Sequence, residues 1–212
     1  MKFSKEMLLL YAVTDRNWAG TQTLYEQIEE ALLGGVTMVQ LREKQLPKDA
    51  FIEEALKVVE LCHKYKVPLI INDEVEVALR SGADGVHVGM EDTPVSEIRR
   101  IVPEDFIIGA TCKTVEQAVA AEKAGANYMG VGAVFPSPTK KNAIRITKEK
   151  LNEICSSVSI PAVAIGGIDY NNISELTGAG MNGFAVVSAI FAAEDIELSA
   201  KQLKNKAKEV IQ

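Results

Sequence analysis

Residues 124–132 read AGANYMGVG, and three other stretches repeat this plan of a glycine followed by a short apolar run. They are LGGVTMVQL at 33–41, SGADGVHVG at 81–89 and AGMNGFAVV at 179–187. The glycines of the four stretches follow one another at spacings of 48, 43 and 55 residues. We expect each to end a helix in the left-handed conformation, directly before a strand; they are Gly34, Gly82, Gly125 and Gly180.

The spacing leaves room for two strand–helix units per repeat, and eight apolar runs supply the strands. We predict strands at 8–15, 38–43, 69–73, 85–89, 106–111, 128–135, 162–167 and 183–190. Helical periodicity is clearest at 48–66, 114–124 and 199–211. The runs do not alternate with polar residues, which is typical of parallel strands buried on both faces. The sequence therefore predicts an α/β fold, a single (β/α)8 TIM barrel forming one domain over residues 1–212.

The composition excludes several classes of protein. Of 212 residues, 47% are hydrophobic and 25% charged, which excludes a disordered chain, and the net charge of −6 argues against nucleic acid or an anionic membrane as partner. No apolar stretch is long enough to span a membrane, and we expect no signal peptide. Three widely spaced cysteines fit neither a disulfide framework nor a zinc site, so we expect a cytoplasmic protein.

In a barrel of this kind the catalytic groups lie at the carboxyl ends of the strands. After the second predicted strand come Gln40, Arg42 and Lys44, which alternate and can point toward the mouth together. Arginine and lysine are suited to phosphate oxygens. The alternative is that they are surface charges at a strand end.

Two aspartates follow the next two strands. Asp73 stands beside Asn72, and Asp92 follows Glu91. Magnesium is commonly held by one or two carboxylates together with substrate phosphates, so these residues are candidate Mg2+ ligands. Each aspartate has an alternative role as the N-cap of the helix that follows it.

A separate phosphate pocket is predicted on the other side of the mouth. The segment after the sixth strand, FPSPTKK at 135–141, is long and ends in two lysines. Gly166 and Gly167 let backbone N–H groups approach an anion, and a short helix beginning near Ser188 would point its positive end at the same place. A solvated turn is the alternative for the long segment.

The remaining reactive side chains have structural interpretations. We expect His63 to be exposed on a helix, His87 to be a hydrogen-bonded core histidine, and Cys112 to lack a catalytic role. A divalent cation, a basic clamp and a separate monophosphate pocket together suggest that pyrophosphate leaves and a second phosphorylated molecule attacks.

The chain also resembles the thiamine-phosphate synthase family over nearly its whole length. The segments that carry the resemblance are YAVTD (11–15), GGVTMVQLREK (34–44), LIINDEVEVAL (69–79), GADGVHVGMED (82–92), GANYMGVGAVFPSPTK (125–140), AIGGI (164–168) and VVSAI (186–190). Their order and spacing agree throughout.

The resemblance implies that a pyrimidine diphosphate, 4-amino-2-methyl-5-hydroxymethylpyrimidine diphosphate, is joined to a thiazole phosphate, releasing pyrophosphate through a pyrimidine cation. It assigns the pyrimidine diphosphate to Gln40, Arg42, Lys44, Asn72 and Lys140. It assigns magnesium to Asp73 and Asp92. It assigns the thiazole phosphate to Ser137, Thr139, Gly167, Val187 and Ser188. Arg42, Lys44 and Lys140 would stabilise the leaving group.

Three positions depart from the family pattern. Thr111 stands where serine is usual, Lys113 where histidine is frequent, and Met90 where glutamine is frequent. Thr111 keeps a hydroxyl that can bind the pyrimidine or its pyrophosphate.

Three other functions are alternatives. The first is a thiazole tautomerase, which needs a histidine that the loops after strands five and six lack. The others are a phosphosugar isomerase or epimerase and a non-catalytic metabolite-binding barrel. We expect small-molecule substrates, and the sequence leaves a homo-oligomer open.

Overall fold

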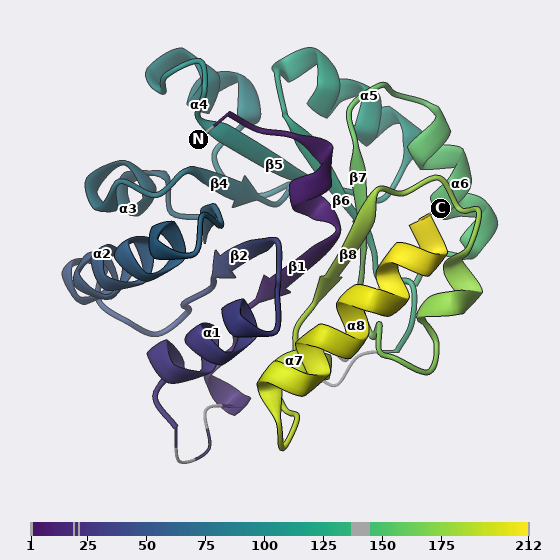
Figure 1. Cartoon of the computed structure of the whole chain (residues 1–212). Coiled ribbons are helices and arrows are strands. Elements are labelled where there is room, and N and C mark those ends of the chain that lie inside the picture. The colour runs from purple at the N-terminus through teal and green to yellow at the C-terminus, as the bar shows by residue number, and fades with distance from the viewer. Residues whose placement is uncertain (1, 19, 21, 137–144, 212) are drawn as a thin grey trace.

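Eight parallel strands form a closed barrel in the computed structural model, which describes residues 2–18, 20, 22–136 and 145–211 (Figure 1). The strands are β1 (Leu10–Val13), β2 (Met38–Leu41), β3 (Leu69–Asn72), β4 (Gly85–Val88), β5 (Ile107–Cys112), β6 (Tyr128–Gly132), β7 (Ala162–Ile165) and β8 (Gly183–Val186). Each strand pairs with its neighbour in sequence, and β8 pairs with β1 to close the barrel, with Leu10 opposite Phe184. The predicted (β/α)8 TIM barrel is confirmed.

Helices surround the strands (Figure 1). They are α1 (Leu24–Leu33), α2 (Lys48–Lys64), α3 (Val75–Ser81), α4 (Val95–Ile101), α5 (Val115–Ala124), α6 (Lys148–Ser156), α7 (Ser188–Phe191) and α8 (Ile196–Ile211). The described residues also form three 3-10 helices, namely η1 (Lys5–Leu8), η2 (Arg16–Trp18) and η3 (Ile173–Leu176). The short η3 lies between β7 and β8, where the other units have an α-helix.

Several predicted elements differ from the observed ones at their ends. The eighth strand stops at Val186 instead of residue 190, because the chain turns at once into α7. The last helix begins at Ile196 rather than residue 199, and Ile196 packs into the core at that point. Apolar runs mark where a strand lies but continue into the loop that leaves it, so they overestimate strand length.

The glycine prediction is confirmed at two of its four positions, holds for the conformation alone at a third and is wrong at the fourth. Gly82 and Gly125 end α3 and α5 in the left-handed conformation, as expected, and Gly180 has a φ of +83° but lies beyond η3. Gly34 has a φ of −67°, and Gly35 adopts the left-handed conformation instead. A Cβ on Gly34 would lie 2.4 Å from the Glu197 carbonyl oxygen, so this glycine allows α1 to approach α8 closely.

The buried side chains form two clusters. An outer cluster fills the space between the strands and the helices. A smaller inner cluster fills the barrel and consists of Leu8, Tyr11, Val13, Met38, Ile70, Ile107, Tyr128, Val163 and Ala185. In the described residues no helix combines the length and apolar character that crossing a membrane requires.

All three cysteines, Cys62, Cys112 and Cys155, are free and buried. Burial raises the pKa of Cys112 to about 12 and that of Cys155 to about 11, so both remain thiols at neutral pH.

Candidate active site

The predicted site residues within the described ranges lie at the carboxyl ends of the strands, hence at one end of the barrel. Gln40 lies in β2, and Arg42 and Lys44 follow it. Asn72 ends β3 and is followed by Asp73, whereas Asp92 lies in the loop after β4. On the far side of the mouth are Thr111 in β5, Gly167 after β7, and Val187 and Ser188 after β8.

The residues after β2 reach different depths of the mouth. The Gln40 side chain is buried in the barrel, where its Nε2 donates to the Tyr11 hydroxyl at 2.7 Å. The Arg42 backbone N–H donates to Thr14 Oγ1, and its guanidinium lies 3.6 Å from the carboxylate of Asp15. Arg42 is half-buried, with 33% of its side chain exposed.

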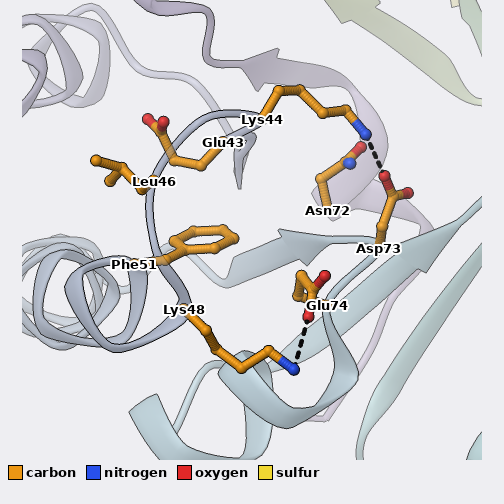
Figure 2. A pocket seen from close by; sticks show the side chains of 8 residues that line it. All are labelled: Glu43, Lys44, Leu46, Lys48, Phe51, Asn72, Asp73 and Glu74. Carbon is orange, nitrogen blue, oxygen red and sulfur yellow. Dashed lines mark hydrogen bonds and ion pairs between the residues drawn. The ribbon is translucent and has the colours of Figure 1, made fainter.

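A cavity of about 280 Å³ lies between the loops that follow β2 and β3 (Figure 2). Lys44 and Asp73 reach toward each other along one side, and the Lys44 ammonium contacts Asp73 Oδ2 at 2.5 Å. Asn72 lies beside this pair, and Phe51 from α2 forms the opposite side. The arrangement places a lysine, an amide and a carboxylate from two neighbouring strands around one space.

Neither Asp73 nor Asp92 acts as the N-cap of the following helix. Glu74 occupies the cap position of α3 and Pro94 that of α4. Asp73 instead has a φ of +63°, an uncommon left-handed conformation for a residue other than glycine. Asp92 accepts a hydrogen bond from the Gly89 backbone N–H at 2.7 Å, which shapes the loop after β4.

A complete protein-made metal centre is absent from the described part of the chain, where no group of three or more histidine, cysteine, aspartate or glutamate side chains is placed to hold an ion. Asp73 and Asp92 offer carboxylate oxygens from neighbouring strands. Carboxylate oxygens are hard ligands, and two residues do not fill a coordination shell. The pair therefore suits an ion that completes its shell with phosphate oxygens and water.

A charged cluster of Arg16, Glu43 and Glu54 supports the loop that carries Arg42 and Lys44. The Arg16 guanidinium contacts Glu43 at 2.7 Å and also contacts Glu54. Burial raises the pKa of Glu43, although Arg16 opposes this rise. The sequence reasoning missed this cluster, because its members come from three separated segments.

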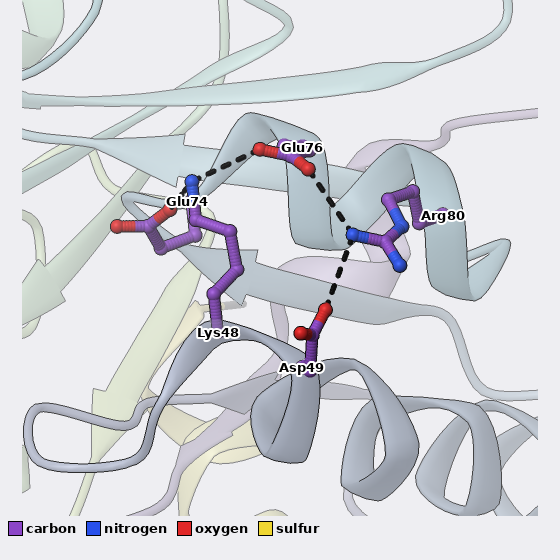
Figure 3. Close-up of polar contacts among 5 residues, drawn as sticks. All are labelled: Lys48, Asp49, Glu74, Glu76 and Arg80. Carbon is purple, nitrogen blue, oxygen red and sulfur yellow. Dashed lines mark hydrogen bonds and ion pairs between the residues drawn. The ribbon is translucent and has the colours of Figure 1, made fainter.

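A second ionic network joins the start of α2 to α3, and two of its members, Lys48 and Glu74, also line this cavity (Figure 3). Lys48 lies 3.4 Å from Glu74 and 3.0 Å from Glu76, and Arg80 bridges Glu76 to Asp49. The side chains are about half exposed or more, so the network ties two helices together at the surface and each ion pair contributes little to stability.

His87 is a core histidine with both ring nitrogens hydrogen-bonded, as predicted. Its Nδ1 lies 3.1 Å from the Tyr128 hydroxyl and its Nε2 lies 3.0 Å from Thr111 Oγ1. Burial lowers the pKa of His87 to about 4, against a smaller opposing effect of Asp92, so the ring is neutral at physiological pH. The other histidine, His63, is exposed on α2 and contacts Asp84.

On the opposite side of the mouth the chain is shaped by glycines. Gly166 and Gly167 have φ values of +102° and +64° and pack against the segment that leaves β6. A Cβ on Gly167 would lie 2.1 Å from the Pro136 carbonyl oxygen. Val187 precedes the four-residue helix α7, which begins at Ser188. Three predicted site residues, Ser137, Thr139 and Lys140, lie outside the described residues.

Comparison with known proteins identifies relatives along the whole barrel. The family described as thiamine monophosphate synthase matches residues 10–190. The thiamine-phosphate synthase of Clostridium botulinum is 46% identical over 93% of this chain and 92% of its own length. Thiamine-phosphate synthase 2 of Streptococcus pneumoniae is 42% identical over 98% of this chain and 99% of its own.

A solved structure, the thiamine phosphate pyrophosphorylase of Pyrococcus furiosus, superposes with a TM-score of 0.90 at 39% identity. It covers 98% of this chain and 99% of its own length. The likeness therefore includes both the fold and the sequence over nearly the whole chain.

Proposed function

The chain belongs to the thiamine-phosphate synthase family and is a transferase of that kind, and we propose how its barrel mouth performs the reaction. A pyrimidine diphosphate binds between the loops after β2 and β3, and a thiazole phosphate binds across the mouth near β7 and β8. Pyrophosphate leaves first, and the thiazole nitrogen then captures the resulting pyrimidine cation.

The contact between Lys44 and Asp73 carries the proposal for the diphosphate side. It brings a cation suited to phosphate and a carboxylate suited to a metal to one cavity, beside the Asn72 amide. We infer that Lys44 transfers its hydrogen bond from Asp73 to the diphosphate when substrate binds. Arg42 and Lys140 add positive charge, so the negative charge that builds on the leaving group is stabilised.

The carboxylates of Asp73 and Asp92 would hold a magnesium ion against the diphosphate. When bound, magnesium neutralises charge on the departing pyrophosphate. The incomplete set of protein ligands supports this assignment, since magnesium usually keeps substrate oxygens and water in its shell.

The thiazole phosphate is assigned to backbone groups near Gly167, Val187 and Ser188, together with Ser137 and Thr139. Positive-φ glycines support this assignment because they permit close approach to an anion. The thiazole nitrogen has no proton to lose, so bond formation needs no general base. A neutral, hydrogen-bonded His87 fits a reaction that needs no general base.

The setting of the enzyme is part of the same proposal. Small molecules are its substrates, nucleic acid and membranes are not its partners, and it works in the cytoplasm. The net charge of −6 supports the absence of a phosphate-polymer partner.

The decisive experiment is incubation of the purified protein with both substrates and magnesium, followed by detection of thiamine phosphate. We expect product to form only when both substrates and magnesium are present. Folded protein that yields no more product than an enzyme-free control would overturn the proposal.

The metal assignment is tested by Asp92→Ala and Asp92→Asn. Asparagine keeps an oxygen that can accept from the Gly89 N–H, so it separates loop shape from charge. Both variants should lose about a hundredfold or more in magnesium-dependent kcat. Glu91→Gln is the matched control, and wild-type rates for Asp92→Asn at limiting magnesium would contradict the assignment.

A further inference from the structure

Five side chains form a continuous chain of hydrogen bonds across the inside of the barrel. Gln40 Nε2 donates to the Tyr11 hydroxyl at 2.7 Å, which lies 2.8 Å from the Tyr128 hydroxyl. Tyr128 is 3.1 Å from His87 Nδ1, and His87 Nε2 is 3.0 Å from Thr111 Oγ1. This series of hydrogen bonds begins at Gln40 in β2 and ends at Thr111 in β5, and both residues are assigned to the substrate.

The direction of these hydrogen bonds follows from the first donor. Because Gln40 gives a proton to the Tyr11 oxygen, the Tyr11 proton is available for the Tyr128 oxygen. Tyr128 then donates to His87 Nδ1, which has to be unprotonated to accept. In the part of the chain that the structure describes, the reverse direction would leave the Tyr11 proton without an acceptor.

The far end of the chain is thereby determined as well. A neutral imidazole with a bare Nδ1 carries its proton on Nε2, and that proton goes to the Thr111 oxygen. The Thr111 hydroxyl still has its own proton, because its oxygen is the acceptor in this contact. That proton is left for a ligand at the mouth.

We propose that this chain of hydrogen bonds makes Thr111 a hydrogen-bond donor toward an acceptor atom of the bound pyrimidine diphosphate, with Tyr128 and His87 as positioning residues. The acceptor is a ring nitrogen or a phosphate oxygen, not the amino group. The inference rests on the proposed function for the identity of the ligand, whereas the donor-to-acceptor direction of the hydrogen bonds rests on the geometry alone.

Two glycines leave room for the Tyr128 and His87 rings inside the barrel. A Cβ on Gly109 would lie 2.2 Å from Tyr128 Cζ and 2.5 Å from His87 Nδ1. A Cβ on Gly130 would lie 3.1 Å from His87 Cε1. Any larger residue at Gly109 would displace the Tyr128 and His87 rings.

The tautomer of His87 is the first test, and it needs no substrate. The chain has two histidines, so a nitrogen-15 histidine spectrum near neutral pH contains two imidazoles, and His63→Gln assigns them. We expect His87 to be neutral with its proton on Nε2. A proton on Nδ1, or a charged ring, would overturn the inference and leave the synthase proposal intact.

The second test asks whether this series of hydrogen bonds affects the binding of the pyrimidine diphosphate. Tyr128→Phe removes the donor to His87 Nδ1 but keeps the aromatic ring, so the Thr111 hydroxyl is no longer held as a donor. We expect the KM for the pyrimidine diphosphate to rise about tenfold with an unchanged KM for the thiazole phosphate. Thr111→Val should give the same result, and Thr111→Ser should restore wild-type behaviour.

Tyr65→Phe is the matched control, because its hydroxyl binds Glu29 on the outside of the barrel. Equal effects of Tyr128→Phe on both KM values, or none on either, would overturn the positioning role. If the protein makes no thiamine phosphate, the spectrum still decides the direction of the hydrogen bonds.

Discussion

The two sides of the barrel mouth differ in the groups that they present. After β2 and β3 the chain presents charged side chains, with Lys44 against Asp73 and the Arg16 cluster behind them. After β7 and β8 it presents backbone, shaped by Gly166 and Gly167. A leaving diphosphate changes its charge during the reaction, whereas the thiazole phosphate keeps its own. Mobile charges suit the first task, and a rigid backbone suits the second.

The largest effect should follow from removing charge on the β2–β3 side. Lys44→Gln keeps most of the side chain but loses the ammonium that stabilises the departing pyrophosphate. We expect kcat/KM for the pyrimidine diphosphate to fall about a hundredfold, measured by thiamine phosphate formation. Lys57→Gln, on the exposed face of α2, is the control, and an equal loss there would remove the special role of Lys44.

The β7–β8 side should respond to shape instead of charge. Gly167→Ala places a Cβ against the Pro136 carbonyl at a backbone φ of +64°. We expect the KM for the thiazole phosphate to rise about tenfold while that for the pyrimidine diphosphate stays constant. Steady-state kinetics with each substrate varied in turn separates the two.

Gly178→Ala is a control for backbone strain alone. Its φ is +79°, but a Cβ there has no atom within 4 Å. If Gly178→Ala raises the KM for the thiazole phosphate as much as Gly167→Ala does, close packing at Gly167 is not the cause.

A smaller effect concerns stability and its dependence on pH. Burial raises the pKa of Glu43, so the folded state holds its proton more tightly than the unfolded state does. The contribution of Glu43 is thus greatest below its unfolded pKa and is lost as the pH rises through the folded pKa. Glu43→Gln should therefore gain in stability relative to the wild type as the pH rises above the ordinary pKa of a glutamate, as measured by urea unfolding.

Glu76→Gln should show the opposite slope. Hydrogen bonds from Lys48 and Arg80 lower the pKa of Glu76, so its contribution is present above its unfolded pKa and lost on acidification. The same sign for both variants would contradict the assignment of Glu43 as a buried carboxyl.

The smallest effect is expected in the network between α2 and α3. Lys48→Ala should lower Tm slightly at low salt, and the difference should vanish in about 1 M salt, where the Debye length falls to roughly 3 Å. A difference that persists at high salt would show that Lys48 does more than balance surface charge.

The sequence predicts the barrel well because its strands are apolar runs at regular intervals, such as Leu69–Asn72 in β3. It places Lys44 and Asp73 at the mouth by their positions after strands. It does not predict that the two side chains meet, because that contact depends on the shapes of two loops. Gly34 was misjudged for a similar reason, since its role is set by a helix more than 160 residues away in sequence.

The sequence does not predict the series of hydrogen bonds inside the barrel. The prediction that His87 is a hydrogen-bonded core histidine is confirmed, but it does not name the partners. Residues that point into a barrel from nonadjacent strands meet across it, and only the structure shows that Tyr128 links the two. Ser137, Thr139 and Lys140 lie outside the described residues, and their positions at the mouth remain predictions.

The three buried cysteines make this enzyme convenient for labelling experiments. With raised pKa values, Cys112 and Cys155 expose almost no thiolate to alkylating reagents, and Cys62 is buried in α2 with a raised pKa as well. A cysteine introduced at an exposed position such as Lys57 would carry a single fluorophore or spin label. The native chain then needs no cysteine-free background before such a probe is attached.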